Sequence, residues 1–204
     1  MRKVKKKYTA FYMVIILMIN FVIGTMPVAA NENDDILNHL TTTVTIRDAD
    51  TGEMTSYKIN NHKLKVSESQ NGSVSTLVIH DIGSTIEDSQ LQRSPSQSNS
   101  DTIYGWKGNV RITWYQDGTW ARLISAGGDW TKVSGNYTMT NKSIRYGQTL
   151  GTNSRSGSAS FVNSYNVAPS WPNGKYGQGH FVGANISGKV NNKYVDIVCN
   201  YTLF

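Results

Sequence analysis

Apolar and polar residues alternate along much of the chain, with the period of two that is typical of β-strands. The pattern is clearest in KYVDIVCNYTLF at the C-terminal end, where one face collects Val195, Ile197, Cys199, Tyr201 and Leu203. Further candidate strands are NYTMTN, SIRYG, SASFVNSY and HFVGANIS, separated by Gly, Asn or Pro. Many short strands with turn signals in about 100 residues predict a β-sandwich over residues 102–204.

A second group of strands is predicted nearer the N-terminus. In TTTVTIRDADTGEMTSYKIN, Thr42, Val44 and Ile46 alternate with polar residues, and DADTGE forms the turn. HKLKVSESQNGSVSTLVIHD repeats the plan with QNG as its turn. Four such strands predict a small antiparallel sheet, marginal alone at this size, and no segment predicts a helix.

The two groups are joined by a stretch with the composition of a linker. Residues 84–101 are rich in Ser, Gln and Asn and poor in apolar residues. We therefore predict an all-β protein with an acidic N-terminal unit over 31–83, a polar linker over 84–101 and a basic, aromatic-rich sandwich over 102–204. Residues 31–100 hold five basic and ten acidic side chains, whereas residues 101–204 hold ten basic and four acidic ones, so the two units could dock.

Residues 1–30 have the order of a secretory signal peptide. The basic head MRKVKKKY precedes an apolar run and the small-residue end MPVAA, which predicts cleavage after Ala30. The alternative is an uncleaved membrane anchor, but Pro27 favours cleavage. We expect a secreted protein, extracellular or wall-associated, of a Gram-positive type and without a transmembrane segment. The mature chain is then nearly neutral, and nucleic-acid binding loses its support.

The stretch WYQDGTW, residues 114–120, predicts a tight hairpin. With Asp117 and Gly118 as the two loop residues, Tyr115 lies opposite Trp120, and Trp114 belongs to the face that forms the core.

The opposite face of this hairpin is the candidate binding surface. It carries Tyr115, Trp120, Arg111 and Arg122, and rings beside guanidinium groups suit sugars and anionic polymers. The alternative is that the rings only stabilise the sheet, under a covering layer.

A short echo occurs in the second half of the chain: RYGQ at 145–148 recurs as KYGQ at 175–178. One interpretation is two similar turns or bulges. The other is two binding sites that each offer a ring and an amide.

Catalytic and metal-binding patterns are sparse. His180 has no nucleophile motif near it, and nothing in the pattern brings Asp129 and Asp196 together as a carboxylate pair. Asp48-Ala-Asp50-Thr-Gly52 fits a hairpin turn better than a calcium loop. We therefore predict no catalytic residues, no metal site and no cofactor. The single cysteine, Cys199, is expected to be a buried thiol.

Two functional hypotheses follow. The first is a non-enzymatic module that binds a cell-wall glycan or anionic surface polymer through the aromatic and arginine face. The second is an antimicrobial precursor whose acidic part is removed by cleavage in the linker, near Gln92-Arg93 or elsewhere. Composition, GTWA at 118–121 and the NYTLF end at 200–204 resemble all-β bacteriocins of the lactococcin type, which implies the second function, although residues 31–100 have no counterpart there. The pattern leaves open the ligand, the oligomeric state and a purely structural role.

Overall fold

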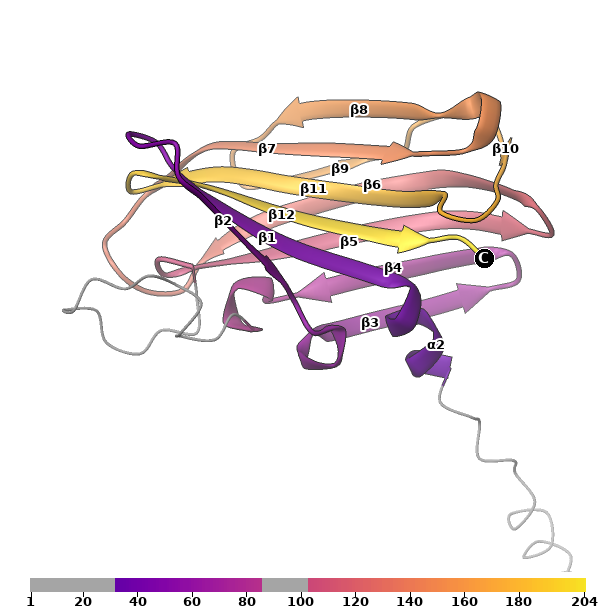
Figure 1. Ribbon diagram of the computed structural model, residues 1–204, viewed down its shortest axis with the longest axis horizontal. Helices are drawn as coiled ribbons and strands as arrows, with labels where there is room; N and C mark the ends of the chain where they lie inside the picture. Colours follow the sequence, from indigo (N-terminus) through magenta and orange to yellow (C-terminus); the bar gives the residue numbers. More distant parts are fainter. Residues whose placement is uncertain (1–31, 86–102) are drawn as a thin grey trace, which may run out of the picture. The chain divides into compact units, whose positions relative to one another are not determined.

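The computed structural model describes residues 32–85 and 103–204, and nearly all of its elements are strands (Figure 1). Its N-terminal part comprises α2 (Glu32–His39), β1 (Leu40–Asp48), β2 (Met54–Lys58), η1 (Asn61–Lys63), β3 (Lys65–Asn71), β4 (Val74–His80) and η2 (Ile82–Thr85). The remainder comprises β5 (Trp106–Asp117), β6 (Trp120–Lys132), β7 (Met139–Gln148), η4 (Gly151–Asn153), β8 (Arg155–Ser160), β9 (Ser164–Val167), β10 (Gly174–Lys175), β11 (Phe181–Val190) and β12 (Lys193–Thr202).

The strands form two antiparallel sheets of six strands each. The first sheet, called sheet A here, has the order β2-β1-β12-β11-β7-β8. The second, sheet B, has the order β10-β6-β5-β4-β3, and β9 also pairs with β6. The predicted all-β class is thereby confirmed.

The two sheets pack face to face around one apolar core. The Trp114 ring of sheet B lies 4.3 Å from the Tyr201 ring of sheet A. The indole Nε1 of Trp130 donates to the carbonyl of Ser187 across the interface at 3.2 Å. Gly128 faces Ile186 so closely that a Cβ atom there would lie 2.5 Å from Ile186 Cγ2, which explains why this inward position carries no side chain. The sandwich architecture follows from these contacts.

The N-terminal strands are divided between the two sheets, which differs from the expected separate small sheet. Strand β1 pairs with β12 over its whole length, from Leu40 opposite Tyr201 to Asp48 opposite Lys193. Strand β4 lies between β3 and β5 in sheet B. Residues 36–204 consequently form one compact unit. The physical reason is that β1 and β4 each have an apolar face that extends the core, including Val44, Leu77 and Ile79.

The local turn predictions hold for both N-terminal hairpins. Asp48 Oδ1 accepts the backbone N–H groups of Asp50 and Thr51 in the β1–β2 turn, as the DADTGE pattern indicates. Gly72 has a positive φ of 58° in the β3–β4 loop, within QNG. The helix α2 was not predicted, because its eight residues are mostly polar and carry little periodic signal.

Two predicted segments fall mainly outside the described residues. The signal peptide at 1–30 does so entirely, and so does all of the 84–101 linker except Ser84 and Thr85. Among the helices of the described residues, none has the length and apolar character needed to cross a bilayer.

Candidate functional site

The β5–β6 hairpin turns one residue later than the sequence indicates. Asp117 pairs with Trp120 and Tyr115 pairs with Arg122, so the loop residues are Gly118 and Thr119. Gly118 takes a positive φ of 54°, the conformation that glycine adopts most readily. The predicted direct pair of Tyr115 with Trp120 is therefore wrong, and the two rings are diagonal neighbours. The pairing differs from the predicted one by two residues, so the residues up to Leu123 stay on their predicted faces; beyond it a β-bulge reverses the alternation on β6.

Trp114 and Trp120 lie on opposite faces of this hairpin. Trp114 is 1% exposed and belongs to the core, as the alternation predicts, whereas Trp120 is 44% exposed. A covering layer over the outer face, the alternative interpretation, is therefore not what the structure shows at Trp120.

The exposed Trp120 ring has a cation beside it from a distant part of the chain. Strand β10 pairs with β6 so that Lys175 lies opposite Trp120. The Lys175 Nζ atom lies 5.5 Å from the centroid of the Trp120 ring, within the range of a cation–π interaction. Sequence reasoning did not identify Lys175, because only the pairing of strands more than fifty residues apart brings it to the hairpin.

Tyr115 and Arg122 form the second half of the hairpin tip. The guanidinium carbon of Arg122 lies 5.7 Å from the Tyr115 ring centroid, and the Tyr115 hydroxyl donates to Asp117 Oδ2 at 3.2 Å. Desolvation and this hydrogen bond raise the pKa of Tyr115, so the phenol stays protonated near neutral pH. We call Tyr115, Trp120, Arg122 and Lys175 the hairpin-tip cluster.

The tip is held by hydrogen bonds from both sides. The backbone N–H of Gln116 donates to the Ser73 carbonyl at 2.8 Å, and that of Tyr176 donates to the Thr119 carbonyl at 2.9 Å. The Tyr176 hydroxyl also lies 2.7 Å from the Gly118 carbonyl oxygen, as a donor. The main chain of the tip is thus preorganised, which lowers the conformational-entropy cost of binding a ligand.

Arg111, the fourth predicted residue, lies apart from the tip. It shares the outer face of sheet B but pairs with Gly127, four positions before Tyr115 on β5. There it lines an open pocket of about 230 Å³ between β4, β5, β6 and β9. Its Nη2 atom donates to Asn166 Oδ1 at 2.7 Å.

The absence of a side chain at Gly127 makes room for this arrangement. A Cβ atom at Gly127 would lie 2.9 Å from Asn166 Oδ1, so any larger residue would displace the amide that holds Arg111. On the other wall of the pocket, Asn109 Nδ2 donates to Asp129 Oδ2 at 2.8 Å, and Thr131 Oγ1 donates to the same oxygen at 3.1 Å. We call Arg111, Asn166, Asn109 and Asp129 the Gly127 pocket.

Three basic groups of this face, Arg111, Arg122 and Lys175, have no carboxylate partner among the described residues. The nearby acids, Asp117 and Asp129, instead accept hydrogen bonds from neutral groups. The three cations are therefore available to an anionic ligand.

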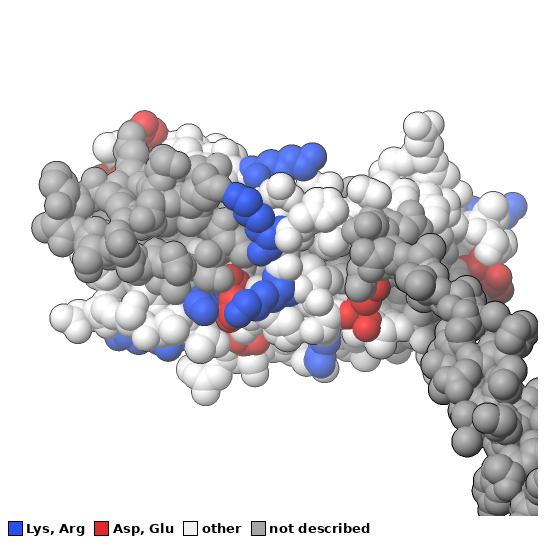
Figure 2. Space-filling model, turned by 90° about the horizontal axis from the view of Figure 1, so that it is seen from below, with Lys and Arg blue, Asp and Glu red and all other residues white. Residues whose placement is uncertain are grey.

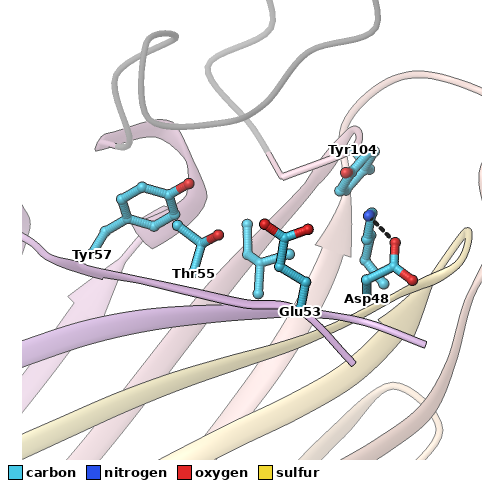
Figure 3. A pocket seen from close by; sticks show the side chains of 7 residues that line it. Asp48, Glu53, Thr55, Tyr57 and Tyr104 are labelled. Atoms are coloured by element: carbon cyan, nitrogen blue, oxygen red, sulfur yellow. Dashed lines mark hydrogen bonds and ion pairs between the residues drawn. The ribbon is translucent and has the colours of Figure 1, made fainter. Parts of the chain in front are cut away.

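A second pocket lies at the far end of sheet A, on its inner side (Figure 3). Lys193 forms an ion pair with Asp48 there, and this contact lowers the pKa of Asp48 and raises that of Lys193. Glu53, Thr55 and Tyr57 complete the lining together with Tyr104. Asp48 and Lys193 neutralise each other, and their ion pair fastens β1 to β12.

The charge distribution elsewhere is mixed. Viewed from the side of β3 and η1, basic and acidic side chains lie next to one another (Figure 2). Lys65 and Lys107, for example, both contact Asp81, at 3.3 and 3.5 Å.

The two carboxylates considered as a catalytic pair lie on opposite outer faces. Asp129 is on the outer face of sheet B, and Asp196, on β12, alternates with the buried residues of sheet A and accepts a hydrogen bond from Ser187. They cannot act on one substrate atom. No group of three metal-ligating side chains suited to an ion occurs among the residues described.

The repeated RYGQ and KYGQ segments have unrelated surroundings, so neither interpretation of the echo holds for the pair. Gln148 is 2% exposed and its Oε1 accepts the backbone N–H of Leu123 at 2.8 Å, which is a structural role inside the core. The second segment follows β10, where Tyr176 supports the hairpin tip. Cys199 is fully buried, as predicted.

Comparison of the chain with known proteins finds no matching family, no similar curated protein and no similar solved structure.

Proposed function

We propose that the protein is a secreted, non-enzymatic binding module that holds a cell-wall glycan or anionic surface polymer on the outer face of sheet B. The observation that carries this proposal is the exposed Trp120 ring, which has the Lys175 ammonium group beside it on the outer face of the sheet.

The chemistry of the hairpin-tip cluster suits such a ligand. An exposed indole offers a flat apolar surface on which a sugar ring can lie, and removing that surface from water contributes about 25 cal/mol per Å². Arg122 and Lys175 supply charge-assisted hydrogen bonds to phosphate or carboxylate groups. Strand pairing and backbone hydrogen bonds fix the main chain that carries the ring before the ligand arrives. These features support the proposal that the outer face of sheet B contacts an extracellular polymer.

The antimicrobial-precursor hypothesis fits the topology less well. Cleavage between residues 84 and 101 would leave β1 paired with β12 and β4 paired with β5. Release of the C-terminal part would break both pairings and expose the core faces around Val44 and Leu77. The acidic part is an integral component of the sandwich, which favours a module that acts with both parts together.

A binding experiment with purified Gram-positive cell walls tests the proposal. The protein is incubated with intact walls and with walls stripped of their anionic polymers, and the bound fraction is measured. Trp120→Ala is compared with Tyr137→Ala, an exposed aromatic residue outside sheet B that is 37% exposed. Arg122→Gln is compared with Arg155→Gln, an exposed arginine on β8 of the other sheet.

We expect Trp120→Ala and Arg122→Gln to bind walls about tenfold more weakly, which corresponds to about 1.4 kcal/mol, while the two control variants bind like the wild type. Binding that depends on the cations should also weaken as salt is raised from low to physiological concentration. Wall binding by Trp120→Ala equal to that of the wild type would refute the assignment of the site.

A further inference from the structure

We infer that the Gly127 pocket is a second subsite for the same polymer and that the ligand is a sugar chain with acidic groups, long enough to contact the hairpin-tip cluster and the pocket together. This inference rests on the proposed function, because it assumes that the tip binds a glycan.

The pocket has the chemistry of a site for one sugar unit. Its volume of about 230 Å³ is smaller than the roughly 300–1,000 Å³ of pockets that enclose a whole drug-sized ligand. It combines a guanidinium group, two amides and a carboxylate, which together donate to and accept from neighbouring hydroxyl groups. Asp129 Oδ1 has no partner among the described residues, so it remains available as an acceptor.

The guanidinium group of Arg111 is held in place by one hydrogen bond and keeps further N–H donors for a ligand. Arg111 is exposed and uses one donor on Asn166, and a guanidinium group has five N–H donors. The remaining donors can form a two-pronged contact with a carboxylate or phosphate, the geometry for which arginine is suited. The acidic group of a sugar can therefore bind on the Arg111 side of the pocket, while Asp129 on the opposite wall accepts a hydrogen bond from a hydroxyl group of the same unit.

The distance between the two subsites requires a ligand of several linked sugar units. Arg111 and Asp117 share the outer face of β5, and Asp117 lies opposite Trp120. At about 3.3 Å per residue, the pocket and the tip are roughly 20 Å apart along the strand. Between them the outer face presents hydroxyl groups, including Thr113, whose Oγ1 lies 3.1 Å from Thr76 Oγ1. A single sugar cannot span this distance, whereas a linear chain lying along β5 can.

The basic side chains of the two subsites share the outer face of sheet B. Arg111, Arg122 and Lys175 lie along one face, and none is neutralised within the described residues. A polymer that repeats an acidic group would satisfy several of them at once, and linked contacts of this kind multiply affinity.

Equilibrium titration of the purified protein with defined probes tests the inference. The probes are a hyaluronan disaccharide, a hyaluronan dodecasaccharide, a neutral chitin oligosaccharide of comparable length, and linear polyphosphate, which is anionic but has no sugar rings. The variants are Arg111→Gln and Asn166→Ala in the pocket and Trp120→Ala at the tip. Arg145→Gln, an exposed arginine on β7 of sheet A, serves as the matched control. Thermal unfolding of each variant confirms that it is folded.

We expect the wild type to bind the dodecasaccharide about a hundredfold more tightly than the disaccharide and more tightly than the other two long probes. Arg111→Gln and Asn166→Ala should each lose about tenfold in dodecasaccharide affinity and keep the disaccharide affinity of the wild type. Trp120→Ala should weaken the binding of both hyaluronan probes, and Arg145→Gln should change neither.

The unfavourable outcomes separate the two proposals. If Trp120→Ala loses binding but the pocket variants keep the wild-type length dependence, the second subsite is refuted and the tip remains. Equal affinity for the chitin oligosaccharide would refute the acidic ligand class, and equal affinity for polyphosphate would refute recognition of sugar rings. No binding of any probe by the wild type would overturn this inference, and the proposed function would fall with it only if the same sample also failed to bind cell walls.

Discussion

Two tryptophans of the β5–β6 hairpin illustrate how single residues acquire different roles from their place in the pleat. Trp114 is 1% exposed and packs on Tyr201, whereas Trp120 is 44% exposed. The period of two was sufficient to predict the inward direction of Trp114. The neighbours of Trp120 could not be predicted in the same way, because Lys175 reaches it through strand pairing between distant segments.

The buried thiol of Cys199 leads to a prediction about its reactivity. Burial raises the pKa of this thiol to about 12, and the reactive form of cysteine is the thiolate. We expect no alkylation of native protein by iodoacetamide at pH 8 and complete alkylation in denaturant, as measured by intact mass. Rapid alkylation without denaturant would show that the β12 face is open to solvent.

The ion pair between Asp48 and Lys193 leads to a prediction about pH. The hydrogen bond from Lys193, together with two backbone N–H groups, holds the pKa of Asp48 well below its usual value of 3.8. A carboxylate with a lowered pKa in the folded state stabilises the fold above that usual value and loses this contribution as the pH falls further.

Asp48→Asn should therefore lower the free energy of unfolding at pH 7, because the amide can keep the turn hydrogen bonds but not the ion pair. The difference between wild type and variant should shrink as the pH is lowered below about 3.8. Urea unfolding at a series of pH values measures it. A difference that does not change with pH would mean that the charge of Asp48 is not the cause.

At the scale of elements, the strands of the C-terminal half were predictable because their alternation is regular. Val195, Ile197 and Cys199 are all fully buried on β12, as their spacing indicates. The β5–β6 loop was misplaced by one residue because both Asp-Gly and Gly-Thr are acceptable loop pairs, and strand pairing decides between them. The Gly127 pocket carried one visible signal, the Gly127-Gly128 pair, since glycine within a strand often marks a close approach of backbone or side chain.

Strand β4 provides the test of how the N-terminal elements contribute to stability. Leu77 is fully buried in this strand, and truncation of a buried leucine to alanine typically costs about 2–5 kcal/mol. We expect Leu77→Ala to lose a free energy of unfolding in that range. Val162→Ala, at an 80% exposed position, should stay within about 0.5 kcal/mol of wild type. A negligible change for Leu77→Ala in urea unfolding would contradict the central place of β4.

At the scale of the whole molecule, the division of the N-terminal strands between both sheets was beyond sequence reasoning. Composition and charge separate residues 31–83 from residues 102–204, and that contrast suggested two units. Non-local pairing, such as β1 with β12, depends on how complementary faces meet in three dimensions. A polar connecting segment gives no information about which strands it joins in space.

This topology predicts the behaviour of the C-terminal half alone. Residues 101–204 would lack β1 to β4, which leaves the backbone edges of β12 and β5 unpaired and part of the core uncovered. We expect this fragment to show no cooperative unfolding transition and a poorly dispersed NMR spectrum. A well-dispersed spectrum with a cooperative transition would instead support independent release of this half.

NMR titration of the isotope-labelled protein with a hyaluronan dodecasaccharide shows whether the outer face of sheet B binds an acidic glycan. We expect saturable shifts of backbone amides in the hairpin tip around Trp120, at Lys175 and around Gly127. Amides of the outer face of sheet A, such as those of Thr45 and Ser143, should not move. The absence of shifts, or shifts confined to sheet A, would contradict binding on sheet B.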